Sequence, residues 1–185
     1  MKLTKHYLET LVEEILVEDS IPSEGGFTTL YHFTQESPEN AKETIELDPE
    51  RFGEMGYSKK DLAVSAVPRT FFYVNPAEKE TFFDEKALYE AKIPTANIYN
   101  FEKALKDPND EVITAVKAEN YNILDMDQVL KKVSGWRQGA WGTENQGEWI
   151  KGPGIADGMY YKTEHFAVVV MFVPVKAYLA EEQPA

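Results

Sequence analysis

The chain has 185 residues, of which 43% are hydrophobic and 12% aromatic, and it contains no cysteine. This length and composition support a folded domain that buries a core without metals, and the lack of cysteine excludes disulfides, thiolate zinc sites and cysteine nucleophiles. The formal net charge is −13 and only three residues are arginines, so the surface should repel nucleic-acid phosphates and anionic membranes.

These features predict a single globular domain over residues 1–180 and a flexible tail over residues 181–185. The first twenty residues lack a long apolar run and carry four glutamates, which is not the pattern of a secretion signal. The longest apolar run, residues 166–174, is too short to span a bilayer. We therefore expect a cytoplasmic protein with no membrane partner.

In chain order, the first predicted element is an amphipathic helix over residues 4–18, where apolar residues recur at the spacing of one helical face. Residues 27–33 (FTTLYHF) are β-branched and aromatic and predict a strand. Residues 34–57 are polar and predict a long connection. Ser58 and Asp61 then suggest a capping box on a short helix.

The middle of the chain alternates short apolar and charged segments. Residues 70–74 (TFFYV) predict a second strand. Short helices are expected over residues 84–92 and 101–106, and a strand over residues 112–116. A clearer helix begins at Asp125, with its apolar face on one side and its end at Gly135.

Residues 135–158 are rich in glycine and hold all three tryptophans, Trp136, Trp141 and Trp149. Residues 166–173 (FAVVVMFV) give the strongest strand pattern, and an uninterrupted apolar run is typical of a strand buried on both faces. Strands and helices do not alternate regularly. The sequence therefore predicts an α+β fold with a central, mostly antiparallel sheet, an N-terminal amphipathic helix and several short helices.

Several common catalytic motifs are absent. The sequence has no Walker loop, no GxGxxG after a strand, no GxSxG elbow and no HExxH. Its histidines are His6, His32 and His165, and no pair of them has the spacing of a metal site. We expect no bound metal.

Three short segments carry residue types that suit chemistry on a nucleotide. The first is Leu30–Thr34, a strand that ends in Tyr-His-x-Thr. The second is Pro68–Tyr73, an aromatic strand entered by Arg69. The third is Thr163–Phe166, in which Glu164 and a histidine directly precede the apolar strand.

In this order the three segments resemble the His–Tyr–Glu branch of the ADP-ribosyltransferase superfamily. The resemblance implies that Glu164 is the catalytic carboxylate and that His32, Thr34, Tyr73 and Arg69 bind the cofactor, NAD, which is consumed as substrate. The Tyr-His-x-Thr form is similar to that of DNA-targeting toxin members. More loosely, the Leu-Tyr-His-Phe segment resembles domains of phage polyvalent proteins, which would place the chain in the cytoplasm of a host cell.

These residue types suit the reaction. Cleavage of the bond between nicotinamide and ribose passes through an oxocarbenium-like state, which a carboxylate such as Glu164 can stabilise. His32 can hydrogen-bond a ribose, an aromatic ring can stack on nicotinamide, and Arg69 can hold the pyrophosphate. Tyr161 competes with Tyr73 for the stacking role.

Each residue also has a structural interpretation. His32 can be a buried histidine with a satisfied hydrogen bond, Tyr73 can belong to the core, Glu164 can be a solvated residue at a strand end, and Arg69 can be a surface ion-pair partner. If these side chains are scattered, a different function is favoured.

That alternative is a non-catalytic interaction or virion-associated protein. Its contact surface would be the Trp/Gly-rich segment, since tryptophan is enriched at binding hot spots; the tryptophans can equally fold back on the core. A transferase fold without activity is a third reading. For an active transferase, the acidic surface favours a protein acceptor over a nucleic acid.

Overall fold

The computed structural model describes residues 20–54, 67–75, 86–119, 124–140, 142, 144, 148–163 and 166–181. The predicted helix over residues 4–18, the capping box at Ser58 and Asp61, and Glu164 lie outside the described residues. Within them, helices and a strand-dominated core combine in an α+β fold, as the sequence predicts.

The core is one sheet of eight strands in the order β2-β10-β4-β1-β3-β9-β8-β5. The pairing of β5 with β8 is parallel, and the other neighbouring strands of this sheet pair antiparallel. The strands are β1 (Phe27–Phe33), β2 (Thr44–Leu47), β3 (Thr70–Tyr73), β4 (Leu88–Pro94), β5 (Ile98–Asn100), β8 (Gly158–Lys162), β9 (Ala167–Met171) and β10 (Val175–Leu179).

Strand β9 confirms the strand that the apolar run at residues 166–173 predicts. It lies between β3 and β8 in the interior of the sheet. Val169 and Met171 belong to one hydrophobic cluster and Val170 and Phe172 to another. The alternation along the strand therefore buries both faces of β9, which explains why the run has no polar position.

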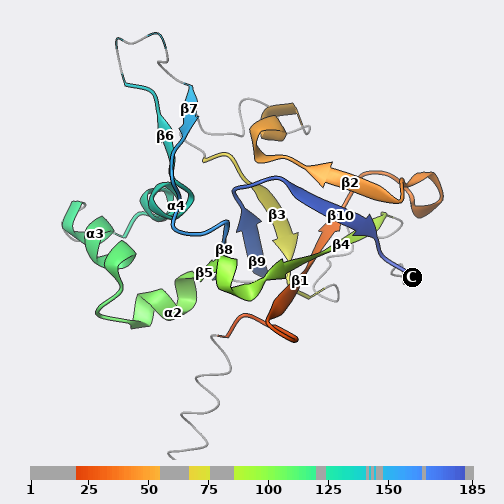
Figure 1. Ribbon diagram of the computed structural model, residues 1–185, viewed down its shortest axis with the longest axis horizontal. Helices are drawn as coiled ribbons and strands as arrows, with labels where there is room; N and C mark the ends of the chain where they lie inside the picture. The colour runs from red at the N-terminus through yellow and green to blue at the C-terminus, as the bar shows by residue number, and fades with distance from the viewer. Residues whose placement is uncertain are drawn as a thin grey trace, which may run out of the picture.

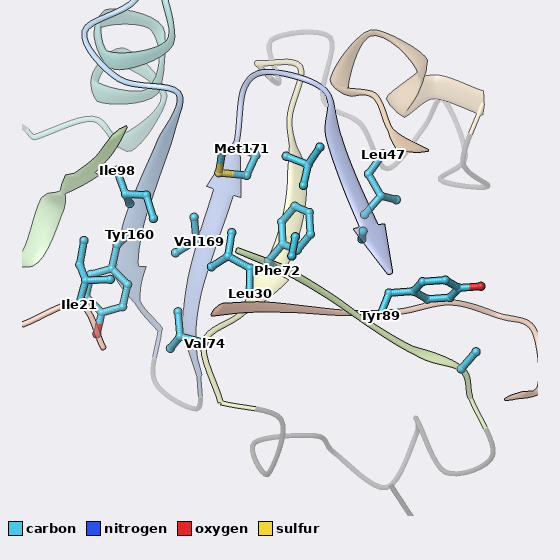
Figure 2. Packing of buried hydrophobic residues seen from close by; sticks show 14 residues of the cluster. Ile21, Leu30, Leu47, Phe72, Val74, Tyr89, Ile98, Tyr160, Val169 and Met171 are labelled. Atoms are coloured by element: carbon cyan, nitrogen blue, oxygen red, sulfur yellow. The ribbon is translucent and has the colours of Figure 1, made fainter. Parts of the chain in front are cut away.

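One face of the sheet is filled by a cluster of side chains from every one of its strands (Figure 2). Leu30 and Phe72 lie at its centre. Leu47 of β2 and Ile98 of β5 belong to the same cluster although their strands lie at opposite ends of the sheet. One continuous cluster therefore runs along this face from one end of the sheet to the other.

The other face is covered at the β5 and β8 end by three helices, α2 (Phe101–Lys106), α3 (Glu111–Glu119) and α4 (Met126–Ser134). Figure 1 shows the three helices gathered on this side of the sheet. Their apolar residues pack with Met159, Val170 and Phe172 in the second cluster. Helix α4 begins and ends as predicted: the Asp125 side chain accepts a hydrogen bond from the Asp127 N–H, and Gly135 closes the helix with φ 75°.

Two predicted elements are wrong in type. The sequence predicts a helix over residues 84–92, but the structure has strand β4 (Leu88–Pro94) here, and β4 pairs with β1 and β10. Several residues of β4 favour helices, but pairing with a strand on each side overrides this helix preference. Residues 112–116 were expected to form a strand but lie in α3. The Asp110 side chain accepts a hydrogen bond from the Ile113 N–H at 2.9 Å and so starts this helix.

The sequence predicts a polar connection over residues 34–57. Part of this connection forms the short strand β2, which lies at one edge of the sheet and pairs with β10. The glycine-rich segment also has structure. Strands β6 (Trp136–Gln138) and β7 (Trp149–Lys151) form a separate two-stranded sheet, which stands away from the eight-stranded sheet in Figure 1.

Candidate functional site

His32 lies near the end of β1 and has a structural hydrogen bond. Its Nδ1 atom lies 2.9 Å from the backbone oxygen of Phe71 on β3. Its ring contacts the Phe72 ring, with 5.6 Å between centroids. Burial lowers the pKa of His32 and the hydrogen bond to Phe71 opposes that shift. A neutral imidazole would donate from Nδ1 to the carbonyl.

His32 and Tyr73 lie on neighbouring strands but on opposite faces of the sheet. Tyr31 is directly opposite Tyr73 in the β1–β3 pairing, and consecutive side chains of a strand alternate between faces. His32 therefore lies on the face of Phe72, away from Tyr73. The prediction that His32 and Tyr73 line a common pocket is wrong, because it depended on a register that the sequence does not show.

Tyr73 belongs to a half-buried aromatic surface on the face opposite His32. Val168 of β9 lies beside Tyr73 in one direction and beside Tyr161 of β8 in the other. Tyr73 also packs edge-on against the ring of Phe166, at 5.7 Å between centroids. We call this surface the aromatic face. Its members are Tyr31, Phe71, Tyr73, Tyr161 and Phe166, all partly exposed.

Arg69 lies on this face, just before β3. Its Cζ atom is 5.3 Å from the centroid of the Phe71 ring, and its Nη1 atom donates to the backbone oxygen of Val67 at 3.0 Å. The Nε atom of Arg69 is one of four buried side-chain polar atoms that have no hydrogen-bond partner among the described residues. A buried guanidinium N–H without an acceptor is unusual, and an anionic oxygen is the kind of acceptor that it prefers.

Arg69 also influences Tyr161. Burial raises the pKa of the Tyr161 hydroxyl, and the positive charge of Arg69 opposes that rise. The guanidinium therefore acts across the aromatic face, from Phe71 toward β8. One cation beside several aromatic rings is a surface suited to a flat ligand that carries negative charge.

Thr163 and Phe166 lie between β8 and β9, next to the aromatic face. The Thr163 N–H donates to the Phe166 oxygen at 2.7 Å, and the Phe166 N–H donates to the Thr163 hydroxyl at 3.0 Å. Glu164, the predicted catalytic residue, lies outside the described residues. Phe166, two positions further along the chain, contacts Tyr73.

Thr34 follows the end of β1. Its backbone N–H donates to the oxygen of Ala87 at 3.0 Å, while its buried Oγ1 has no partner among the described residues. The same holds for Oγ1 of Thr70, which is 2% exposed on β3. Arg69 and Tyr73 are therefore the predicted residues that share a face, and His32 is separated from them.

Two of the three tryptophans fold back on the core. Trp136 is 5% exposed and belongs to the cluster under the helices, and Trp149 packs against the same cluster. Trp141 lies outside the described residues. The burial of Trp136 and Trp149 therefore limits contact through these two side chains. The exposed residues beside them, Arg137, Gln138 and Glu148, are polar.

Sequence reasoning did not single out Tyr31, Phe71 and Phe166 as parts of a surface. A usable signal was present, because Arg69, Phe71 and Tyr73 alternate along one strand and must share a face. The lateral partners on β1, β8 and β9 depend on strand order and register, which the alternation does not reveal.

No group of three or more metal-ligating side chains, and no helix long and apolar enough to cross a membrane, occurs in the part of the chain that the structure describes. Comparisons with protein-family models, with curated proteins and with solved structures find no match for this chain.

Proposed function

We propose that this chain is an NAD-consuming mono-ADP-ribosyltransferase that binds the dinucleotide on the aromatic face. The observation that carries the proposal is the Arg69 guanidinium, which stacks over Phe71 with a buried Nε that lacks an acceptor. A pyrophosphate oxygen is the kind of acceptor that an arginine fork prefers. Tyr73 and Tyr161 lie on the same face and can stack on a flat ring.

Glu164 supplies the carboxylate in this proposal. In the reaction, the bond between the ribose carbon and the nicotinamide nitrogen breaks, and its electron pair leaves with neutral nicotinamide. A nucleophile of the acceptor bonds to the same carbon and loses its proton. A carboxylate at that carbon stabilises the positive charge that develops between these steps. The net charge of −13 favours a protein acceptor over a nucleic acid.

The position of His32 supports a second candidate, a non-catalytic binding protein. His32 hydrogen-bonds the Phe71 backbone and lies on the face opposite Tyr73, so it does not supply the ribose contact on the aromatic face that the resemblance implies. Under this candidate the aromatic face binds a partner or a nucleotide without turnover.

Release of nicotinamide from NAD, measured with wild type and with Glu164→Gln, tests the enzymatic proposal. Glutamine keeps the shape of the side chain and removes its charge, so the fold should survive. Loss of such electrostatic stabilisation lowers turnover by about a hundredfold to a thousandfold. His165→Gln, one position further, is the matched control and should retain turnover. Equal rates for wild type and Glu164→Gln, or no NAD chemistry with any protein acceptor offered, would exclude the enzyme and leave the binding protein.

A further inference from the structure

A groove lies at the β5 edge of the eight-stranded sheet, three strands away from β3, which Arg69 directly precedes. Strand β5 is the last strand at this end, and two hollows of about 310 and 270 Å³ lie beside it. Both hollows are lined by Ala96, Ile155 and Ala156, so they adjoin at these residues. We call this feature the Ile155 groove.

Ile155 lines both hollows and is 62% exposed. A folded protein more often buries an apolar side chain of this size. Leu105 of the adjacent helix α2 is also exposed, at 38%. Isolated exposed apolar residues are common, but one that separates two hollows offers a partner both an anchor and space around it.

The charged groups of the groove are mainly acidic. Asp107 and Asp110 line one hollow and Asp157 lines the other. Each accepts local hydrogen bonds through one carboxylate oxygen: Asp107 from the Asn109 N–H, Asp110 from the Tyr99 hydroxyl and the Ile113 N–H, and Asp157 from the Asn97 amide. These bonds fix the carboxylates in place without neutralising them.

The two lysines of the groove do not balance this charge equally. Lys103 lies exposed on α2. Lys151 is committed to the protein: its Nζ donates to the backbone oxygens of Ser134 at 2.7 Å and Phe172 at 3.3 Å, and it lies 5.2 Å from the Trp136 ring centroid. Because Ser134 ends helix α4, this ammonium stabilises the helix C-terminus, and it also attracts the Asp157 carboxylate. Three carboxylates and two ammonium groups leave the groove a formal net charge of −1.

We propose that the Ile155 groove is a docking surface for a positively charged segment of a partner protein. An apolar side chain of the segment packs against Ile155 and fills a hollow, and its lysine or arginine side chains face Asp107, Asp110 and Asp157. Charge complementarity selects this occupant, because a groove with fixed carboxylates on a chain of net charge −13 repels nucleic acid and anionic lipid. Docking at the Ile155 groove does not require that the aromatic face binds NAD.

The test is fluorescence anisotropy of a short labelled peptide of alternating lysine and leucine, titrated with the full-length chain at near-physiological salt. Two variants change the groove: Ile155→Ser, and the pair Asp107→Asn and Asp157→Asn. Two controls make matched changes elsewhere: Tyr178→Ser, which removes another exposed apolar residue, and the pair Glu43→Gln and Glu46→Gln, which removes two exposed charges at the β2 end of the sheet.

Each groove variant should weaken peptide binding about fivefold or more, the usual effect of removing an interface anchor, while both controls bind as wild type does. Equal weakening by the two acidic pairs would mean that the peptide senses net charge alone and would overturn the proposal. No binding to wild type, or equal binding of a glutamate–leucine peptide, would overturn it as well.

Discussion

At the scale of single residues, His32 and Arg69 differ in how the fold uses their polar atoms. His32 makes a hydrogen bond to the Phe71 backbone and its ring packs at a tilt against that of Phe72, so its role is explained by the structure alone. Arg69 has a buried Nε with no acceptor among the described residues. The histidine therefore stabilises the sheet, and the arginine is the stronger candidate for a ligand contact.

The lowered pKa of His32 predicts a dependence of stability on pH. Since burial favours the neutral ring in the folded state, its stabilising effect is complete above its unfolded pKa of about 6.5 and is lost as the pH falls through the lower folded pKa. Thermal unfolding of wild type should therefore move to lower temperature between pH 7.5 and 5.5 by more than that of His32→Gln, which can still donate to the Phe71 carbonyl. Parallel curves for the two proteins would show that His32 does not carry this effect.

Gly135 gives a second prediction for a single residue. It closes helix α4 with φ 75°, and a Cβ built there would lie 2.6 Å from the backbone oxygens of Gly152 and Pro153. Gly135→Ala combines left-handed strain with this clash and should lower the free energy of unfolding by about 2 kcal/mol or more. Gly25→Ala is the control, because its φ is 58° and nothing lies within 4 Å; strain alone predicts about 1 kcal/mol. Urea unfolding that gives equal losses would refute the role of the close approach.

At the scale of elements, β9 lies between the two hydrophobic clusters and contributes side chains to both. Val169 is fully buried in one cluster and the adjacent Val170 in the other. A polar substitution on this strand therefore disturbs a core whichever face it occupies.

Val169→Asp should lower the free energy of unfolding by about 3 kcal/mol or more, because an unpaired carboxylate would be buried among apolar side chains. Tyr178→Asp introduces the same charge at a position of β10 that is 52% exposed and should cost about 1 kcal/mol at most. Chemical denaturation measures both. A loss for Val169→Asp no larger than that for Tyr178→Asp would contradict the buried position of β9.

The elements that the sequence predicted well share one property, namely that local pattern and tertiary packing agree. Strands β1, β3 and β9 are aromatic or continuously apolar, and α4 has both caps. Strand β4 was predicted as a helix because Leu88, Glu90 and Lys92 favour helices, whereas its pairing with β1 and β10 determines the outcome. Helix α3 was predicted as a strand because its valines and isoleucine favour strands.

At the scale of the whole molecule, the aromatic face and the Ile155 groove lie on different parts of one sheet. The aromatic face spans β1, β3, β9 and β8, and the groove lies at the β5 edge. Helix α2 lies between them: Glu102 accepts a hydrogen bond from the Lys162 N–H at 2.8 Å, next to Tyr161, and Lys103 lines the groove. A partner held at the groove would therefore be near the strand that carries Tyr161.

The candidate site was predictable only in part. Residue types and chain order singled out Arg69 and Tyr73, and their spacing on one strand puts them on the same face. The separation of His32 from Tyr73 follows from the register that pairs Tyr31 with Tyr73, and a shift of one residue would have reversed it. The Ile155 groove joins residues from β5, α2 and the segment before β8, and no single sequence pattern links them.

The most direct test of the proposed site is calorimetric titration of NAD into wild type, Arg69→Gln and Arg137→Gln. Both variants remove one positive charge, but Arg137 is exposed on β6, away from the aromatic face. Wild type and Arg137→Gln should bind NAD equally, and Arg69→Gln should bind about ten- to a hundredfold more weakly, as expected when a charged hydrogen bond is lost. Absence of NAD binding by wild type, or equal binding by all three proteins, would contradict the assignment of the aromatic face as a dinucleotide site.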